Sequence, residues 1–147
     1  EAGVLPLDAE YIRGVRALCD EHNALMIVDE VQTGMGRTGA WFAFQRGDLG
    51  GITPDIVTFA KGVAGGFPMG GMISFGEELS ALFSPGTHGS TFAGNPLGAA
   101  AALAAIGVIE REGLVAQANE RGEQLRTGIM ATCSRRCAAA ACSMRSC

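Results

Sequence analysis

Two stretches of this sequence place charged residues immediately after runs of large apolar side chains. Leu25 to Val28 leads directly into Asp29 and Glu30, and Ile56 to Ala60 leads into Lys61, the only lysine of the chain. Continuous apolar runs of this length are typical of strands buried on both faces of a parallel sheet. A carboxylate at a buried strand end needs a cationic partner, so the two strand ends are the first places to look for chemistry.

The remaining pattern predicts further elements in the order expected of an α/β protein. Asn95 and Pro96 are a good N-cap and first position for an alanine-rich helix that is apolar nearly all round, so we expect that helix to be buried. The other expected elements are a helix from the N-cap Asp8 to about His22, a strand Met72 to Phe75, a short helix Glu77 to Phe83, and helices Leu97 to about Glu112 and Leu114 to Ile129. This order predicts part of a three-layer α/β/α domain with a mainly parallel sheet.

Composition narrows the classes of function. A chain of 147 residues can bury a core, and a net charge of −4 without a basic block argues against nucleic acid as a partner. No apolar run approaches the roughly 20 residues that a membrane helix needs, and no secretory signal is evident, so the cytoplasm is the expected location. Because the sequence opens on Glu1 in the middle of a motif, we expect an upstream part.

The cysteines predict neither a metal site nor a disulfide scaffold. Cys19 stands alone, and the other four lie within the last 15 residues at spacings that contain no C-x-x-C pair. Residues 130–147 contain no acid and no large apolar residue apart from two methionines, and fit neither a helix face nor a strand. We therefore expect a domain over residues 1–129 and a separate cysteine-rich tail over 130–147. The tail is either aberrant, from a frame shift or truncation, or a disordered natural terminus.

The glycine-rich stretch after the first strand matches the dinucleotide-binding pattern G-x-G-x-x-G at residues 34–39. In that fold the first glycine turns directly from the strand into a helix whose N-terminus meets the pyrophosphate. Here Asp29 to Thr33 intervene, and the acid expected at the end of the next strand is Asp55, which instead begins one. The setting therefore argues against a dinucleotide site.

An ATPase is a second alternative, because LMIVDE resembles a strand that ends in a magnesium-binding Asp and a catalytic Glu. Such sites also need a phosphate loop with Gly-Lys-Ser/Thr, and Lys61 is followed by Gly62. That loop could precede residue 1, so this alternative stays open.

A third chemistry uses Lys61 itself. Because Lys61 follows an apolar strand, we expect its amine to be desolvated and therefore a better nucleophile, although a lysine that extends to the surface is the alternative. A cationic ring bonded to Lys61 and paired with Asp29 would give both strand ends a partner. Pyridoxal phosphate is such a ring, since its aldehyde reacts with lysine and its ring nitrogen prefers a carboxylate.

Three motifs, in order and spacing, resemble the class III aminotransferases of fold type I: VDEVQTGMGRTG, PDIVTFAKGVAGGFPMGG and HGSTFAGNPLG. The resemblance covers about residues 1–129 and implies part of the large domain of a pyridoxal-phosphate enzyme. It is strongest to members that exchange the δ-amino group of N-acetylornithine with 2-oxoglutarate in arginine biosynthesis. Ornithine or another ω-amino acid is the alternative donor, and a non-catalytic fragment that only shares the fold also stays open.

The resemblance implies a role for each residue that matches the motifs around the cofactor ring. Lys61 would bind the cofactor covalently and, once released, move a proton. Asp29 would pair with the pyridine nitrogen and keep it protonated. Val31 would pack against the ring face, and Gln32 would reach the phenolic oxygen of the ring.

The resemblance further implies a homodimer with a shared active site. Thr91 would bind the cofactor phosphate of the neighbouring subunit, and Ser90 would lie beside it near the substrate. Glu1 would lie near the substrate amino group. Glu30 is expected to make a structural hydrogen bond, and Arg37 to support its loop.

Overall fold

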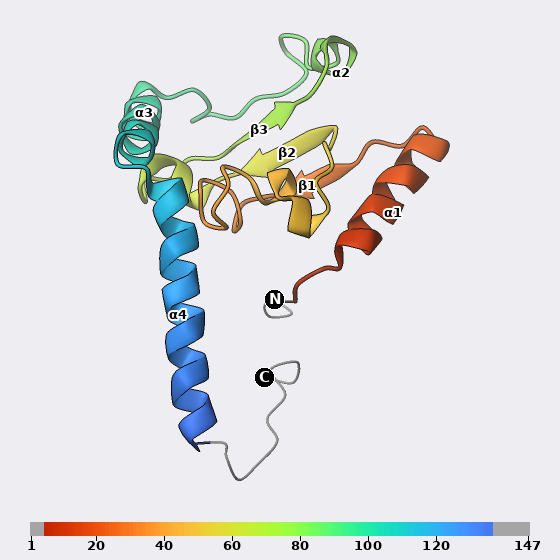
Figure 1. The fold of residues 1–147 in the computed structure, drawn as a ribbon. Helices are drawn as coiled ribbons and strands as arrows, with labels where there is room; N and C mark the ends of the chain where they lie inside the picture. Colours follow the sequence, from red (N-terminus) through yellow and green to blue (C-terminus); the bar gives the residue numbers. More distant parts are fainter. Residues whose placement is uncertain (1–4, 137–147) are drawn as a thin grey trace.

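The computed structural model of this chain describes residues 5–136, and side chains up to Met130 apart from that of Leu49. In this range β1 (Ile27–Asp29), β2 (Ile56–Phe59) and β3 (Gly71–Ser74) form a sheet in the order β1-β2-β3. β1 and β2 pair in parallel, with Asp29 opposite Thr58, and β3 pairs antiparallel with β2. The described strands therefore form a small mixed sheet, flanked by α1 and α3 at its two ends, in an α/β arrangement (Figure 1).

Helix α1 (Ala9–Glu21) begins where the sequence predicts, because the Asp8 carboxylate accepts a hydrogen bond from the Glu10 amide at 2.7 Å. An ion pair of 2.7 Å between Arg16 and Asp55 attaches this helix to the residue just before β2. The same Asp55 oxygen accepts the Met26 amide at 2.7 Å. One carboxylate thus connects α1 with the segments that lead into β1 and β2.

The central strand is buried as expected, but the edge strand is not. Val57 is fully buried in β2, whereas Ile27 in β1 is 60% exposed and Leu25 before it is 54% exposed. The expectation that Leu25 to Val28 is covered on both faces is therefore wrong in this structure. An apolar strand is buried only where helices cover it, and β1 is an edge strand that pairs with β2 alone among the described strands.

Helix α3 (Pro96–Arg111) also begins as predicted, with the Asn95 side chain accepting the Gly98 amide at 2.7 Å. Its expected burial is wrong, because Leu97 is 65% exposed and Leu103 is 72% exposed. Only the small face that carries Gly98 and Ala102 is buried. An alanine-rich helix can pack closely on one side and leave its larger residues on the open side.

The 3-10 helix η3 (Lys61–Ala64) follows β2 and carries the lysine. Val63 and Ala64 are buried in one cluster with Met35 and Ala102, and the cluster is completed by partly buried side chains: Trp41, Phe59, Phe67, Met69, Ala101, Ile106 and Ile109. Burying a valine side chain stabilises a fold by about 1.5–3 kcal/mol. The turn that begins at Lys61 is therefore held by a core between β2 and α3.

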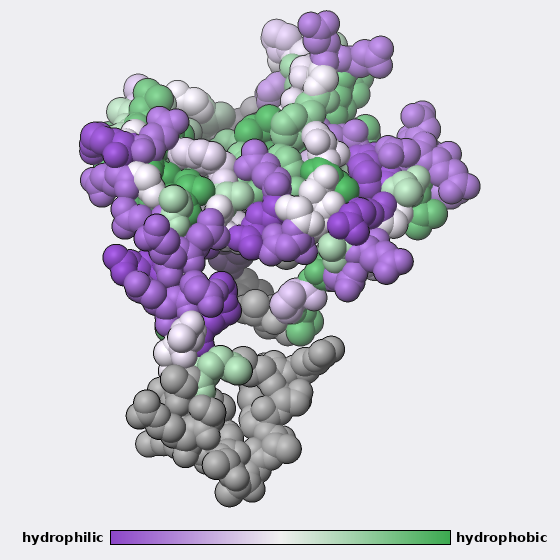
Figure 2. Space-filling model, in the orientation of Figure 1, coloured by the Kyte–Doolittle hydropathy of each residue, from purple (hydrophilic) through white to green (hydrophobic). Residues whose placement is uncertain are grey.

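Helix α4 (Leu114–Arg136) runs seven residues beyond the predicted end at Ile129, so the expectation that residues 130–136 fit no helix is wrong. Alanine, methionine and arginine favour helices, and no glycine or proline interrupts the stretch. The helix runs away from the sheet, and its part next to the sheet is mainly polar (Figures 1 and 2). Residues 137–147 lie outside the described range, so the domain boundary at residue 129 stays a prediction.

The short helix α2 (Glu77–Ala81) follows β3, close to where the sequence places it. Two 3-10 turns, η1 (Ala43–Gln45) and η2 (Gly47–Leu49), lie between the glycine-rich stretch and β2. None of the helices within residues 5–136 has the length and apolarity needed to cross a membrane.

Candidate active site

Asp29 and Lys61 lie at the carboxyl ends of two adjoining parallel strands. Asp29 is opposite Thr58, and Lys61 follows Thr58 by three residues. Both side chains are exposed. One Asp29 oxygen accepts the Val31 amide at 2.9 Å, and neither the other oxygen nor the Lys61 amine has a partner among the described residues. A carboxylate and an amine are thus both available to a ligand at this edge of the sheet.

The Lys61 backbone is strained. Its φ angle is +47°, in the left-handed region that side chains other than glycine rarely adopt. Gly62 follows at once, and a Cβ there would make ordinary van der Waals contact with Met35 Cβ at 3.4 Å, so the glycine-rich loop packs against this turn. Non-glycine residues in this conformation are concentrated at functional sites, where the surrounding structure holds them.

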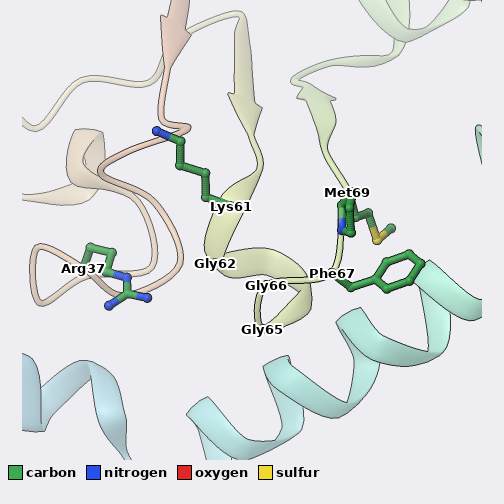
Figure 3. A pocket seen from close by; sticks show the side chains of 8 residues that line it. Arg37, Lys61, Gly62, Gly65, Gly66, Phe67 and Met69 are labelled. Atoms are coloured by element: carbon green, nitrogen blue, oxygen red, sulfur yellow. The ribbon is translucent and has the colours of Figure 1, made fainter.

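The expected desolvation of Lys61 is wrong in this structure. The strand ends at Phe59, and the chain has left the sheet when it reaches the lysine, whose side chain is exposed. In Figure 3 the lysine extends toward the segment that leaves β1. The Lys61 amine is therefore accessible to a ligand because it lies just beyond the strand end. Burial does not make it reactive.

Lys61 lines an open depression of about 610 Å³. The other lining residues are Arg37, Gly62, Gly65, Gly66, Phe67, Pro68 and Met69 (Figure 3). Two of the eight lining residues are cationic and none is acidic. The surface around the lysine is therefore suited to an anionic ligand.

Glu30, next to Asp29, is a buried carboxylate with hydrogen bonds to the segment that follows β1. Its side chain is 1% exposed and accepts hydrogen bonds from the Thr33 hydroxyl and, at 2.9 Å, from the Phe44 amide. Its backbone carbonyl accepts the Gly34 amide at 2.8 Å. The expected structural hydrogen bond of Glu30 is confirmed, and it sets the start of the glycine-rich loop, residues 34–39.

The far end of this loop is held by residues that sequence reasoning missed. Asn119 of α4 donates to the Gly39 carbonyl at 2.9 Å, and Arg46 donates to the Thr38 carbonyl and, at 3.2 Å, to the Asn119 side-chain oxygen. Gly39 has φ +83°, and a Cβ on it would lie 1.9 Å from that oxygen. These contacts span up to 80 residues of sequence, so no local pattern could have indicated them.

The other predicted site residues lie in two places. Val31 is half-buried and Gln32 is exposed in the turn that follows Asp29, close to the strand end. Ser90 and Thr91 are exposed on the connection from α2 to α3, on the β3 side of the sheet (Figure 1). Among the described residues no hydrogen bond or ion pair joins Ser90 or Thr91 to Lys61. Glu1 lies outside the described residues.

A comparison with models of protein families identifies the family of this chain. The family described as class-III aminotransferases matches residues 1–137. The chain belongs to the class-III aminotransferase family. This membership confirms the resemblance of the three motifs and excludes the dinucleotide-binding and ATPase alternatives, because one aminotransferase pattern accounts for both strand ends and the glycine-rich loop.

A curated relative in this aminotransferase family is the acetylornithine aminotransferase of Bifidobacterium longum. It is 75% identical over 133 residues, which are 90% of this chain and 31% of the relative. The chain thus spans about a third of the length of that aminotransferase.

Solved structures of aminotransferases share the fold. The ornithine delta-aminotransferase of Plasmodium falciparum is 34% identical with a TM-score of 0.79, over 90% of this chain and 33% of that one. The taurine:2-oxoglutarate aminotransferase of Bifidobacterium kashiwanohense, solved with PLP and glutamate, is 37% identical with a TM-score of 0.78, over 90% and 29%. The predicted fold, part of a fold type I aminotransferase, is therefore confirmed.

Proposed function

We propose that this chain is the lysine-bearing segment of a pyridoxal-phosphate aminotransferase that exchanges the δ-amino group of N-acetylornithine with 2-oxoglutarate. The observation that carries the proposal is the juxtaposition of Asp29 and Lys61 at the ends of adjoining parallel strands. The donor is supported by the 75% identity to the acetylornithine aminotransferase of Bifidobacterium longum. The acceptor and cofactor are supported by the related enzyme solved with PLP and glutamate.

The described residues fit pyridoxal phosphate. Asp29 keeps one carboxylate oxygen without a described partner, as a pyridinium nitrogen requires, and the Lys61 amine is exposed and unpaired. When bound, the cofactor supplies an electron-withdrawing ring that stabilises the negative charge left on the substrate carbon after deprotonation.

Lys61 and Asp29 then have distinct tasks. The Lys61 amine would hold the cofactor through its aldehyde carbon. Once released, Lys61 Nζ would move a proton between the substrate carbon that carries the amino group and the cofactor carbon. The negative charge of Asp29 keeps the ring nitrogen protonated. Val31, two residues along, would pack on the ring face, and Gln32 would donate to the phenolic oxygen.

Thr91 and Ser90 act across a homodimer in this proposal. Both are exposed, and no hydrogen bond among the described residues joins them to Lys61 of their own chain, which supports a role for Thr91 at the cofactor phosphate of the neighbouring subunit. Ser90 and Glu1 are proposed to lie near the substrate.

We also propose a cytoplasmic location, since Cys19 is the only cysteine before residue 133 and no disulfide scaffold is indicated.

The experiment is a hybrid enzyme, in which the matching 133-residue stretch of the Bifidobacterium longum relative is replaced by that of this chain. We expect transamination between N-acetylornithine and 2-oxoglutarate, with a lower kcat/KM for ornithine. Borohydride reduction followed by peptide mass spectrometry should find the cofactor attached to Lys61. A stable hybrid that does not transaminate, or one that prefers ornithine, would contradict the proposed substrate.

A further inference from the structure

Glu30 is a buried carboxylate directly next to Asp29. It is 1% exposed, and among the described side chains it is the only charged one that is buried. Removing a carboxylate from water costs free energy unless hydrogen bonds or an ion pair compensate it. A methionine of similar length would fill the same space without that cost. The carboxylate therefore does something at this position that packing alone does not.

The Glu30 side chain joins the residues after β1 to the turn η1. One carboxylate oxygen accepts the Thr33 hydroxyl, and the other accepts the Phe44 amide at 2.9 Å. Phe44 is itself anchored, because its ring packs on those of Phe42 and Phe75 with centroids 5.9 and 5.8 Å away. Glu30 also lines a mostly apolar cavity of about 370 Å³, where a low dielectric strengthens hydrogen bonds. Both carboxylate oxygens are thus bonded to neighbouring segments of the fold.

The backbone of Glu30 is held as firmly as its side chain. Its amide donates to the Thr58 carbonyl at 2.9 Å, which continues the pairing of β1 with β2 past Asp29. Its carbonyl accepts the Gly34 amide at 2.8 Å, and a Cβ on Gly34 would lie only 2.8 Å from that carbonyl oxygen. The turn of residues 29–34 is therefore tight, and the four hydrogen bonds of Glu30 fix it.

The orientation of Asp29 depends on this turn. One Asp29 oxygen accepts the Val31 amide at 2.9 Å, so the carboxylate is bonded to the same stretch of backbone that Glu30 holds. A shift of the backbone at residue 30 would therefore move the Asp29 carboxylate with it.

We propose that Glu30 is a positioning residue, which holds the Asp29 carboxylate in the orientation in which it binds the pyridine nitrogen of the cofactor. This inference rests on the proposed function, in which Asp29 binds that nitrogen. A misplacement of about 1 Å can lower a rate by about a hundredfold, so a residue that touches neither cofactor nor substrate can still control turnover. Glu30 thus has a role in the reaction beyond its structural hydrogen bonds.

The test compares variants of Glu30 in the cofactor-loaded hybrid enzyme. Glu30→Met removes both acceptors with little change in length. We expect kcat to fall by about 10- to 100-fold with a smaller change in KM, as a displaced Asp29 carboxylate predicts. The pH at which the cofactor spectrum changes should move in the same direction as in Asp29→Asn, and the apoenzyme should bind pyridoxal phosphate more weakly.

Glu30→Gln is the conservative variant. Its amide oxygen can accept the Phe44 amide, and its NH2 group can donate to the oxygen of the Thr33 hydroxyl. Because both contacts then survive without the charge, kcat and the spectrum should return most of the way to those of the unsubstituted hybrid. If Glu30→Met does not fold, Thr33→Val takes its place in every measurement, because it removes one of the two contacts and keeps the shape.

A double variant shows whether Glu30 acts through Asp29. In the Asp29→Asn background, Glu30→Met should lower kcat further by no more than about twofold, because independent effects multiply whereas effects that act through one residue do not. A fully multiplied loss in the double variant would show that Glu30 acts independently of Asp29 and would overturn the proposal.

The matched control is Asp55→Asn, which removes another carboxylate that joins distant segments, through Arg16 and the Met26 amide. Among the described residues, Asp55 has no hydrogen bond to the turn of residues 29–34. Asp55→Asn should lower thermal stability and leave the cofactor spectrum and cofactor affinity unchanged.

Two further results would contradict the role of Glu30. One is a stable Glu30→Met enzyme with unaltered kcat and spectrum, and the other is an equal spectral change in Asp55→Asn. If the unsubstituted hybrid fails to transaminate, the proposed function fails, and the cofactor titrations and spectra still judge Glu30 separately.

Discussion

Asp29 and Lys61 are brought to one edge of the sheet by the parallel register of β1 and β2, which sets Asp29 opposite Thr58, three residues before the lysine. The two residues are separated by two 3-10 turns and a glycine-rich loop along the chain. An amine and a carboxylate without an ion pair to each other are thereby presented together to a ligand. Carboxyl ends of neighbouring parallel strands are where open α/β sheets bind their ligands.

Lys61→Ala should abolish turnover in the hybrid enzyme, because it removes both the covalent attachment and the proton carrier. The visible absorption of the lysine-bound cofactor should disappear, although cofactor can still bind through its phosphate. Absorption spectroscopy and a single-turnover assay check this. Persistence of the lysine-bound absorption after dialysis would show that another residue holds the cofactor.

Asp29→Asn should give an enzyme that is coloured but slow. The asparagine oxygen can still accept the Val31 amide, now at 2.9 Å, so the local backbone should be kept while the charge is lost. We expect kcat to fall by about 10²–10³, the loss typical of removing one preorganised electrostatic group. Steady-state kinetics and the pH dependence of the cofactor spectrum measure this, and turnover equal to that of the unsubstituted hybrid would contradict the role of Asp29.

Thr91→Ala should weaken cofactor retention by roughly tenfold, the scale of one lost hydrogen bond to a charged group. Dialysis against phosphate buffer followed by cofactor assay measures the effect. Thr87→Ala is the matched control, because Thr87 lies on the same connection and its hydroxyl bonds only to near neighbours, the Ser84 carbonyl at 2.7 Å and the His88 ring at 3.3 Å. Equal cofactor retention in the two variants would contradict the proposal that Thr91 binds the cofactor phosphate of the neighbouring subunit.

Asp55 should make the stability of the chain depend on pH. The hydrogen bond from Arg16, followed by that from the Met26 amide, lowers the pKa of Asp55 below its ordinary value of 3.8. Since the folded-state pKa is the lower one, the stabilisation is fully present above about pH 4 and is lost as pH falls through the folded pKa. Urea unfolding between pH 7 and 3 measures this.

Asp55→Asn provides the control for that titration. Because Asp55 is half-buried, its removal should lower the free energy of unfolding at pH 7 by about 1–2 kcal/mol and flatten the acid dependence. An unchanged pH profile would show that the ion pair with Arg16 contributes nothing measurable.

Gly39→Ala should destabilise the chain by about 1–2 kcal/mol, because φ is +83° and the new Cβ would displace the end of the Asn119 side chain, 1.9 Å away, from its hydrogen bond to Gly39. Gly47→Ala is the control, since nothing lies within 4 Å of a Cβ there and no positive φ is required. Thermal unfolding compares the two. Equal effects would mean that the contact between the loop and α4 is not important for folding.

Much of the local structure could be predicted from the sequence. Asp8 and Asn95 cap helices where their side chains precede apolar periodic segments, and the apolar run before Lys61 forms the buried central strand. The motifs that contain Asp29 and Lys61 indicated the family, which the match over residues 1–137 confirms. These features depend on residues close together in the chain, so a local sequence pattern can predict them.

Tertiary structure decided the rest. The exposure of Lys61, the uncovered apolar face of β1 and the clamp of Asn119 on Gly39 depend on which distant segments meet, and residues 80 apart leave no local signal. Arg37 is the clearest case. Its sequence shows a cation in a glycine-rich loop, but only the packing of that loop against Gly62 brings its side chain to the depression that Lys61 lines, because contacts between distant segments are properties of the folded chain.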